Sequence, residues 1–288
     1  MQSDLDRALS GNYTYVIAEI GINHNGSIET AKQLMNLAKQ SGCDAVKFQK
    51  RTLDIVYSKS TLDSPRESPW GTTTREQKEG LEFGLEEYKE IDAYSKQISI
   101  PWFASAWDIP SQDFLKGFNL PFNKIASAMV THLDFLKVVA SEQKMTFLST
   151  GMATDKDIDL AVKIFTDAKC PVILMHTVSV YPCAEENLNL KAIQTLKDKY
   201  QLPVGYSGHE STVAPSLVAT VLGAVAVERH ITLDRAMYGS DQAASLAPRG
   251  LVELVSEIRR FPKMLGSGVK EYAPGEDDVA KKLRYWTS

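Results

Sequence analysis

Two histidines follow apolar runs that have the composition of buried β-strands, and this placement suits a bound metal ion. His209 comes after the run at 203–207, His230 comes after the run at 224–227, and a helical segment of small residues at 213–223 separates them. A strand, a helix and a second strand form a β-α-β unit, so both imidazoles are expected at the same end of a parallel sheet. Neutral imidazoles at neighbouring strand ends can hold a divalent cation. The alternative is that each histidine merely caps its strand.

Alternation along a strand decides which side chains can share a site. Near the carboxyl end of one run Lys47 and Gln49 point to the same face, and near the end of another Glu228 and His230 do so while Arg229 points away. Polar groups that share a face at several strand ends predict the floor of an active site.

Two lysines inside apolar runs need an explanation, because lysine is seldom fully buried without a partner. Lys47 and Lys124 are in this position, and one interpretation is a pair of salt bridges with Glu19 and Glu228. The other is an anion site, in which two ammonium groups and nearby hydroxyls receive a phosphate and a carboxylate. The further candidates at or near strand ends are Ser105, Ser127, Ser149, Ser179, Tyr181 and Ser207.

The elements that must position these residues alternate between strand and helix patterns along the chain. Strands are predicted at 15–21, 45–50, 102–107, 123–128, 146–150, 172–176, 203–207 and 224–227. Helices are predicted from Ser27 to Gly42 and at 86–97, 111–117, 132–142, 156–168, 190–199, 213–223 and 248–265. Such alternation is typical of an α/β protein, and about 250 residues is the size of a closed (β/α)8 TIM barrel. An open doubly wound sheet is the alternative, but no GxGxxG follows the first strand.

Residues 51–84 interrupt the alternation with a polar sequence rich in Ser, Thr, Pro and Gly. A loop of this length in a compact domain is usually a lid or a substrate loop rather than a linker. We therefore predict one (β/α)8 barrel domain over 1–288, with 51–84 as a long loop after the second strand.

Composition narrows the classes of partner and location. The formal net charge of −4 gives no reason to expect nucleic acid or an anionic membrane as a partner. The three cysteines lack CxxC spacing, which is typical of a reducing compartment. No apolar run reaches the roughly 18 residues of a membrane span, and the amino terminus lacks the layout of a signal peptide. These features predict a cytoplasmic protein without membrane attachment.

Several stretches resemble the sialic acid synthases, that is, the N-acetylneuraminate synthases and their relatives. In chain order they are IAEIGINHNG around Glu19, DAVKFQK (44–50), NKIAS (123–127), FLSTGM (147–152), YP (181–182), VGYSGH (204–209), VERHIT (227–232) and GSDQAASL (239–246). The resemblance covers nearly the whole chain. It implies a C–C bond-forming transferase that condenses phosphoenolpyruvate with an N-acylmannosamine-type amino sugar, giving a nonulosonic acid and phosphate. It also implies a divalent metal, manganese in most members, with magnesium or cobalt as alternatives.

The resemblance gives each candidate residue an expected role. His209 and His230 match the metal ligands. The catalytic residues would be Glu19, Lys47 and Lys124, of which Glu19 would stabilise positive charge at C2. The positions that hold phosphoenolpyruvate are matched by Lys47, Lys124, Ser127, Ser149 and Ser207, and those around the metal, the water and the sugar by Glu19, Gln49, Tyr181 and Asp241. Asp241 is named by the resemblance alone, since its sequence context indicates only a turn or a helix cap.

Three departures from the family pattern lie on the sugar side. The chain ends at KKLRYWTS, where the family's linker to a small antifreeze-like domain begins, so we expect that domain to be absent. Met129 stands where many relatives carry an acid, and Ser179 stands where an Asn is common. A thioether cannot replace the hydrogen bonds of an acid, so the acceptor is expected to differ from plain N-acetylmannosamine. Exposed barrel faces are compatible with a homodimer.

Other functions remain open on the sequence. A related octulosonate or heptulosonate synthase would use a phosphorylated aldose and need a second phosphate site, for which only Arg51 and Arg249 are candidates. A metal-dependent aldolase or sugar isomerase would not consume phosphoenolpyruvate. A non-catalytic relative could bind phosphoenolpyruvate or a sialic acid as a sensor, but the presence of both histidines, both lysines and Glu19 favours an enzyme.

Overall fold

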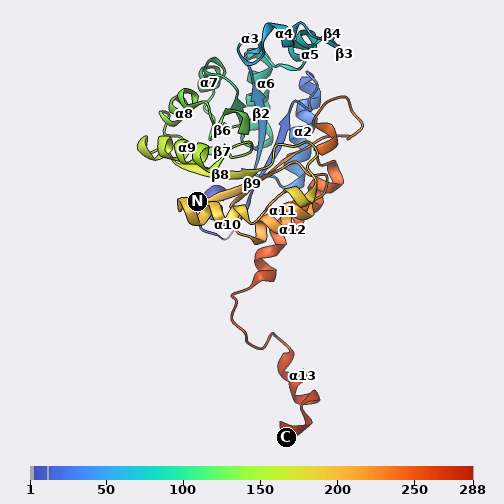
Figure 1. Ribbon diagram of the computed structural model, residues 1–288. Helices are drawn as coiled ribbons and strands as arrows, with labels where there is room; N and C mark the ends of the chain where they lie inside the picture. Colours follow the sequence, from blue (N-terminus) through green and yellow to red (C-terminus); the bar gives the residue numbers. More distant parts are fainter. Residues whose placement is uncertain (1–2, 12, 288) are drawn as a thin grey trace.

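A closed barrel of parallel strands forms the centre of the molecule (Figure 1). The computed structural model describes residues 3–11 and 13–287. The barrel strands are β1 (Tyr15–Gly21), β2 (Ala45–Lys50), β5 (Trp102–Ala106), β6 (Asn123–Ile125), β7 (Thr146–Ser149), β8 (Val172–Thr177), β9 (Val204–Gly208) and β10 (Ala226–His230). Each pairs in parallel with the next in that order, and β1 also pairs with β10, which closes the ring. The predicted (β/α)8 barrel is thereby confirmed.

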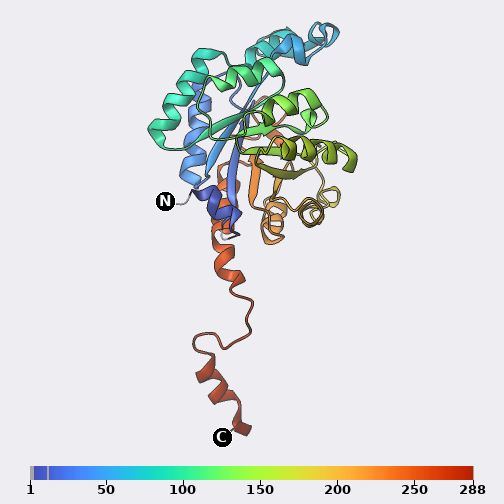
Figure 2. The same cartoon turned by 90° about the vertical axis from the view of Figure 1, so that its left-hand side faces the viewer.

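Helices surround the barrel on all sides (Figure 2). They are α2 (Ile28–Ser41), α6 (Leu85–Ile98), α7 (Ile109–Lys116), α8 (Leu133–Ala140), α9 (Asp155–Asp167), α10 (Ala192–Tyr200), α11 (Ala214–Val221) and α12 (Pro248–Leu265). The caps of α2 are those expected: the Ser27 side chain accepts a hydrogen bond from Thr30 N, and Gly42 ends the helix at a φ of 84°. The predicted strand at 123–128 is shorter than expected, because the chain turns into a 3-10 helix, η1 (Ser127–Met129).

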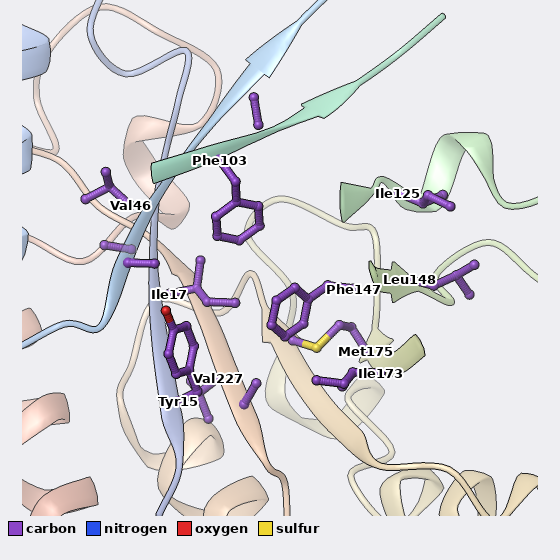
Figure 3. Packing of buried hydrophobic residues seen from close by; sticks show 14 of the residues in the cluster. Tyr15, Ile17, Val46, Phe103, Ile125, Phe147, Leu148, Ile173, Met175 and Val227 are labelled. Atoms are coloured by element: carbon purple, nitrogen blue, oxygen red, sulfur yellow. The ribbon is translucent and has the colours of Figure 1, made fainter. Parts of the chain in front are cut away.

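Aromatic rings fill the interior of the barrel (Figure 3). Phe103 and Phe147 come from different strands and lie 5.8 Å apart between ring centroids, and Phe122 packs edge-on against both. In the strand register Phe103 pairs with Lys47, and Phe147 pairs with Lys124. The two lysines therefore leave the barrel wall at the level of an apolar aromatic layer.

The segment 51–84, predicted as a long loop after the second strand, contains short helices and a hairpin. It contains α3 (Leu53–Val56), α4 (Lys59–Leu62), a hairpin of β3 (Pro65–Ser68) and β4 (Gly71–Thr73), and α5 (Thr74–Leu81), at the top of Figure 1. Local hydrogen bonds explain this, since Thr73 and Glu76 form a capping box at α5 and the Ser58 side chain caps α4. Trp70 of this segment packs against Tyr238 in the loop after β10, with ring centroids 5.7 Å apart.

Two short helices were not predicted. α1 (Asp4–Leu9) buries Leu5 and Ala8 in the core. α13 (Glu276–Leu283) has no buried residue and lies on the segment that extends away from the barrel after α12, at the bottom of Figures 1 and 2. Among the helices of the described residues, none is long and apolar enough to cross a membrane.

Replacing Phe147 with alanine should destabilise the barrel strongly. Its ring is fully buried and contacts Phe103 and Phe122, so truncation leaves a cavity, and we expect a loss of about 3–5 kcal/mol in the free energy of unfolding. Urea denaturation followed by circular dichroism measures this loss. Leu283→Ala is the control, because Leu283 is 63% exposed, and a comparable loss in both variants would contradict the interpretation.

Candidate active site

One pocket of about 290 Å³ lies among the carboxyl ends of the barrel strands and brings the predicted residues together. The predicted residues that line it are Glu19, Lys47, Gln49, Ser105, Lys124, Ser127, Ser149, Ser179, Tyr181, Ser207, His209 and His230. Asp241 does not line the pocket, but its Oδ2 lies 3.8 Å from His230 Nδ1. The fold thus gathers side chains from distant parts of the sequence into one small volume.

The two lysines of the pocket are paired with two carboxylates. Lys47 Nζ lies 2.8 Å from Glu19 Oε2 and 3.5 Å from Glu228 Oε1, and Lys124 Nζ lies 3.6 Å from the same Glu228 oxygen. All four side chains are almost completely buried. The expected salt bridges are therefore present, and both lysines also line the pocket. Glu228 lines the pocket as well, on the same strand as His230.

Burial and these ion pairs shift the charges of the cluster in different directions. Burial lowers the pKa of Lys124 to about 8, and the attraction of Glu228 offsets this only in part. Burial also acts on Lys47, but the carboxylates of Glu19 and Glu228 outweigh it and raise the pKa of Lys47. Burial opposes ionisation of Glu228, yet Lys124 and Lys47 hold its pKa below the ordinary value. Lys47 is therefore charged at neutral pH. Lys124 loses its proton at a pH slightly above neutral.

Hydroxyl and amide groups orient the charged residues. Lys124 Nζ donates a hydrogen bond to Ser149 Oγ, and Ser207 Oγ donates to Glu228 Oε1 at 3.2 Å. Gln49 Nε2 donates to Glu19 Oε1 at 2.8 Å, so this carboxylate is held from two sides.

Two further hydroxyls approach each other across Gly151. Ser127 Oγ accepts a hydrogen bond from Gly151 N at 3.1 Å. A Cβ at position 151 would lie 2.4 Å from Ser179 Oγ and 2.7 Å from Ser127 Oγ, which is closer than real contacts allow. With glycine at this position, both hydroxyls keep their places without a clash.

The two histidines face each other with ring centroids 5.4 Å apart. His209 Nδ1 hydrogen-bonds to the carbonyl oxygen of Val178 at 2.8 Å, so this nitrogen carries the proton and Nε2 keeps a free lone pair. Burial, and next the neighbouring His230, lowers the pKa of His209 to about 3, so the ring is neutral. His230 Nδ1 is buried and has no hydrogen-bond partner among the described residues. The ring of Tyr181 packs on His209 at 3.9 Å between centroids.

These imidazoles fit a divalent cation that is bound in part by substrate. Within residues 3–11 and 13–287, no group of three or more His, Cys, Asp and Glu could hold a metal ion. His209 and His230 would therefore be the only ligands of these types, and water or substrate oxygens would fill the other positions. Open positions of this kind are typical of catalytic rather than structural metal sites.

The sequence missed several apolar and aromatic residues of the pocket. Trp107 lines it directly after β5, and the guanidinium of Arg51 lies 4.1 Å from the Trp107 ring centroid. Met152 and Thr177 also line it. Trp107 and Met152 are not polar, so polarity at strand ends does not indicate them, although their positions after β5 and β7 are a signal in the sequence.

Met129 lies outside this pocket, in a neighbouring cavity of about 450 Å³. The two spaces share Trp107 and Ala128 as lining residues. The walls of the cavity are otherwise mainly apolar and include Ile55 and Val56 of α3. The departure noted at Met129 therefore concerns a space beside the pocket.

The chain is similar to known proteins over most of its length. The model of the NeuB family matches residues 34–270. N-acetylneuraminate-9-phosphate synthase of Mus musculus is 37% identical over 272 residues, which is 93% of this chain and 76% of the relative. N,N'-diacetyllegionaminic acid synthase of Campylobacter jejuni is 36% identical over 271 residues, which is 91% of this chain and 80% of that relative. The structure of an N-acetylneuraminic acid synthetase from Leptospira borgpetersenii, in complex with citrate, superposes with a TM-score of 0.83 at 33% identity, covering 96% of this chain and 94% of that one.

Barrel, pocket and relatives together define a condensing enzyme that uses phosphoenolpyruvate. More narrowly, the chain belongs to the NeuB family.

Lys124→Met should weaken the binding of phosphoenolpyruvate about 10- to 100-fold, because a hydrogen bond to a charged group contributes about 1.5–3 kcal/mol. Isothermal titration calorimetry with phosphoenolpyruvate at pH 7 measures the dissociation constant. Lys163→Met is the control, since Lys163 is exposed on α9 and pairs only with Asp167 among the described residues. An unchanged dissociation constant in Lys124→Met would exclude Lys124 from the anion site.

The affinity for phosphoenolpyruvate should fall as the pH rises from 7 to 9. The pKa of Lys124 is about 8, so Lys124 is mostly charged below this pH and mostly neutral above it, and only the charged form attracts an anion. The same titration at pH 7, 8 and 9 tests this. In Lys124→Met the change in phosphoenolpyruvate affinity near pH 8 should disappear. Identical pH profiles of affinity in Lys124→Met and the unmodified protein would contradict the assignment of this change to Lys124.

Proposed function

We propose that this enzyme condenses phosphoenolpyruvate with an N-acylmannosamine-type sugar, giving a sialic acid-like nonulosonic acid and phosphate, with a divalent cation bound at the histidines. One observation carries the proposal: two buried lysines and two facing histidines line the same pocket. The names of the relatives, which are synthases of N-acetylneuraminate 9-phosphate and of diacetyllegionaminic acid, support the class of product.

The anion half of the pocket would receive phosphoenolpyruvate. Lys47 and Lys124 each lie more than 3.4 Å from Glu228, so these ion pairs are loose and leave ammonium N–H groups for a phosphate and a carboxylate. The hydroxyls of Ser127, Ser149 and Ser207 would supply further donors. The charges of two lysines balance those of two glutamates before the substrate binds, so the anion would favour the protonated form of Lys124.

The histidine half would receive the cation and the sugar. His209, held by Val178, and His230 would bind a divalent metal, manganese by family resemblance, with magnesium or cobalt as alternatives. When bound, such a cation would act as a Lewis acid on the aldehyde of the open-chain sugar. Tyr181 and Asp241 lie beside the two imidazoles and would contact the sugar and its water molecules.

Glu19 would act between the anion half and the histidine half, at the central chemical step. Carbon C3 of the enol would add to the aldehyde carbon, which leaves positive charge at C2. The Glu19 carboxylate, fixed by Lys47 and Gln49, would stabilise that charge, and water would then add at C2. Phosphate would leave from the resulting tetrahedral centre, and Lys47 with Lys124 would balance its charge.

The acceptor is proposed to differ from plain N-acetylmannosamine, because the space beside the pocket is apolar. Met129, Ile55 and Val56 line it, and Asp108, the carboxylate there, is engaged by hydrogen bonds from Thr52 and Ser111. Such a space would suit a deoxy or acylated substituent better than a free hydroxyl.

A phosphorylated acceptor is a second candidate, favoured by cations near the pocket. Arg51 stacks on Trp107 and donates a hydrogen bond to Gln49, both of which line the pocket. The pKa of Lys78 is lowered by burial and then by the neighbouring charges of Arg51 and Arg66, so three cations gather on this side. Arg249, by contrast, is exposed at the start of α12 and does not line the pocket.

Release of phosphate from phosphoenolpyruvate tests the proposal. The assay contains manganese and a panel of acceptors: N-acetylmannosamine, its 6-phosphate, a 2,4-diacetamido hexose, mannose and arabinose 5-phosphate. We expect release with an acylamino sugar and loss of release in EDTA, because the histidines alone cannot polarise the aldehyde. Preference for the 6-phosphate would support the phosphorylated acceptor, whereas release with mannose or arabinose 5-phosphate alone would contradict the proposed class.

A further inference from the structure

A fully buried ion pair lies directly behind the two histidines. Arg229 precedes His230 on β10, and Glu210 follows His209 after β9. Arg229 Nη1 lies 2.8 Å from Glu210 Oε1, and both residues are 0% exposed. Neither lines the pocket, so neither belongs to the residues that contact substrate.

The ladder between β9 and β10 stops just short of the two histidines. The pairing of β9 with β10 ends with Glu228 opposite Ser207 and Arg229 opposite Gly208, one residue before each histidine. His230 pairs with Glu19 of β1 instead. The β9–β10 ladder therefore does not by itself fix the separation of the imidazoles, and side chains next to them can contribute.

Arg229 supplies this connection. Its guanidinium donates hydrogen bonds to the carbonyl oxygens of Glu210 and of Thr212, the latter at 2.8 Å, both in the segment just after His209. A planar guanidinium has five donors in a fixed geometry, so it can hold several oxygens at once. The residue before one histidine thus fixes the chain that follows the other.

Glu210 is itself held from the opposite side. Tyr206 Oη donates to Glu210 Oε2 at 2.8 Å, and Ser216 Oγ donates to Glu210 Oε1 at 3.2 Å. Arg229 Nη1 also donates to Ser216 Oγ at 3.0 Å, which connects the network to α11. The network leaves both carboxylate oxygens of Glu210 with partners.

Burying two charges is costly, and an apolar pair of similar size is often equally stable at such a place. The pair therefore contributes orientation more than stability. We propose that Arg229 and Glu210 are positioning residues, which fix the separation of His209 and His230 and thereby the affinity for the divalent cation. This inference rests on the cation of the proposed function.

The chain offers a matched control at the opposite end of the barrel. Arg259 Nη2 lies 2.7 Å from Asp44 Oδ2, and the guanidinium also donates to the carbonyl oxygens of Thr14 and Gly42. This pair has the same chemistry but no histidine beside it. Changing it alters the barrel without altering the proposed metal site.

The test compares two doubly substituted proteins, Arg229→Met with Glu210→Gln and Arg259→Met with Asp44→Asn. Free manganese is measured by electron paramagnetic resonance, binding of phosphoenolpyruvate by calorimetry, and folding by circular dichroism. We expect the manganese dissociation constant to rise about 10- to 100-fold in the first protein, the cost typical of residues that orient metal ligands. It should stay unchanged in the second, and phosphoenolpyruvate should bind both proteins as it binds the unmodified one.

Arg229→Lys keeps the charge but loses the planar fork, and it provides a second variant if the double substitution does not fold. We expect an intermediate loss of manganese affinity with a native circular dichroism spectrum. Equal manganese affinity in the two double variants, or in Arg229→Lys and the unmodified protein, would overturn the inference. Absence of manganese binding in the unmodified protein would instead refute the proposed cation site, and the positioning role would fall with it.

Discussion

Two ammonium groups held inside an apolar barrel by two carboxylates are the constraint on which the rest of the site depends. Lys47 and Lys124 start beside Phe103 and Phe147, where an unpaired charge would be very unfavourable. Glu19 and Glu228 solve this problem from β1 and β10. The ion pairs are longer on the Glu228 side, at 3.5 Å from Lys47 and 3.6 Å from Lys124.

Strand β1 connects the two chemical halves because it closes the barrel. Its Glu19 is in register with Lys47 of β2 on one side and with His230 of β10 on the other. The Glu19 carboxylate contacts Lys47, and its strand is paired with that of His230.

The sequence predicted the barrel because the alternation of strand and helix patterns is local, and it predicted most of the pocket because parallel strands bring their carboxyl ends together. Asp241 was named only by family resemblance, since its approach to His230 depends on the loop after β10. Trp107 and Met152 were not predicted because a large apolar side chain at a strand end is equally typical of core packing. The fold of 51–84 was missed because its stability comes from caps and from the packing of Trp70, which composition does not reveal. The roles assigned to the pocket residues stay predictions.

The pairing of β1 with β10 also has a consequence for how the protein forms. Asn23 donates a hydrogen bond to the carbonyl oxygen of Ile231, 208 positions away, and Glu19 meets His230 at the same seam. Contacts between such distant parts of a chain form slowly, because the entropy of closing the loop must be overcome first. Until the last strand docks, Lys124 lacks its carboxylate and Glu19 has no histidine beside it. The pocket is thus a late product of folding, and no fragment that ends before β10 can contain it.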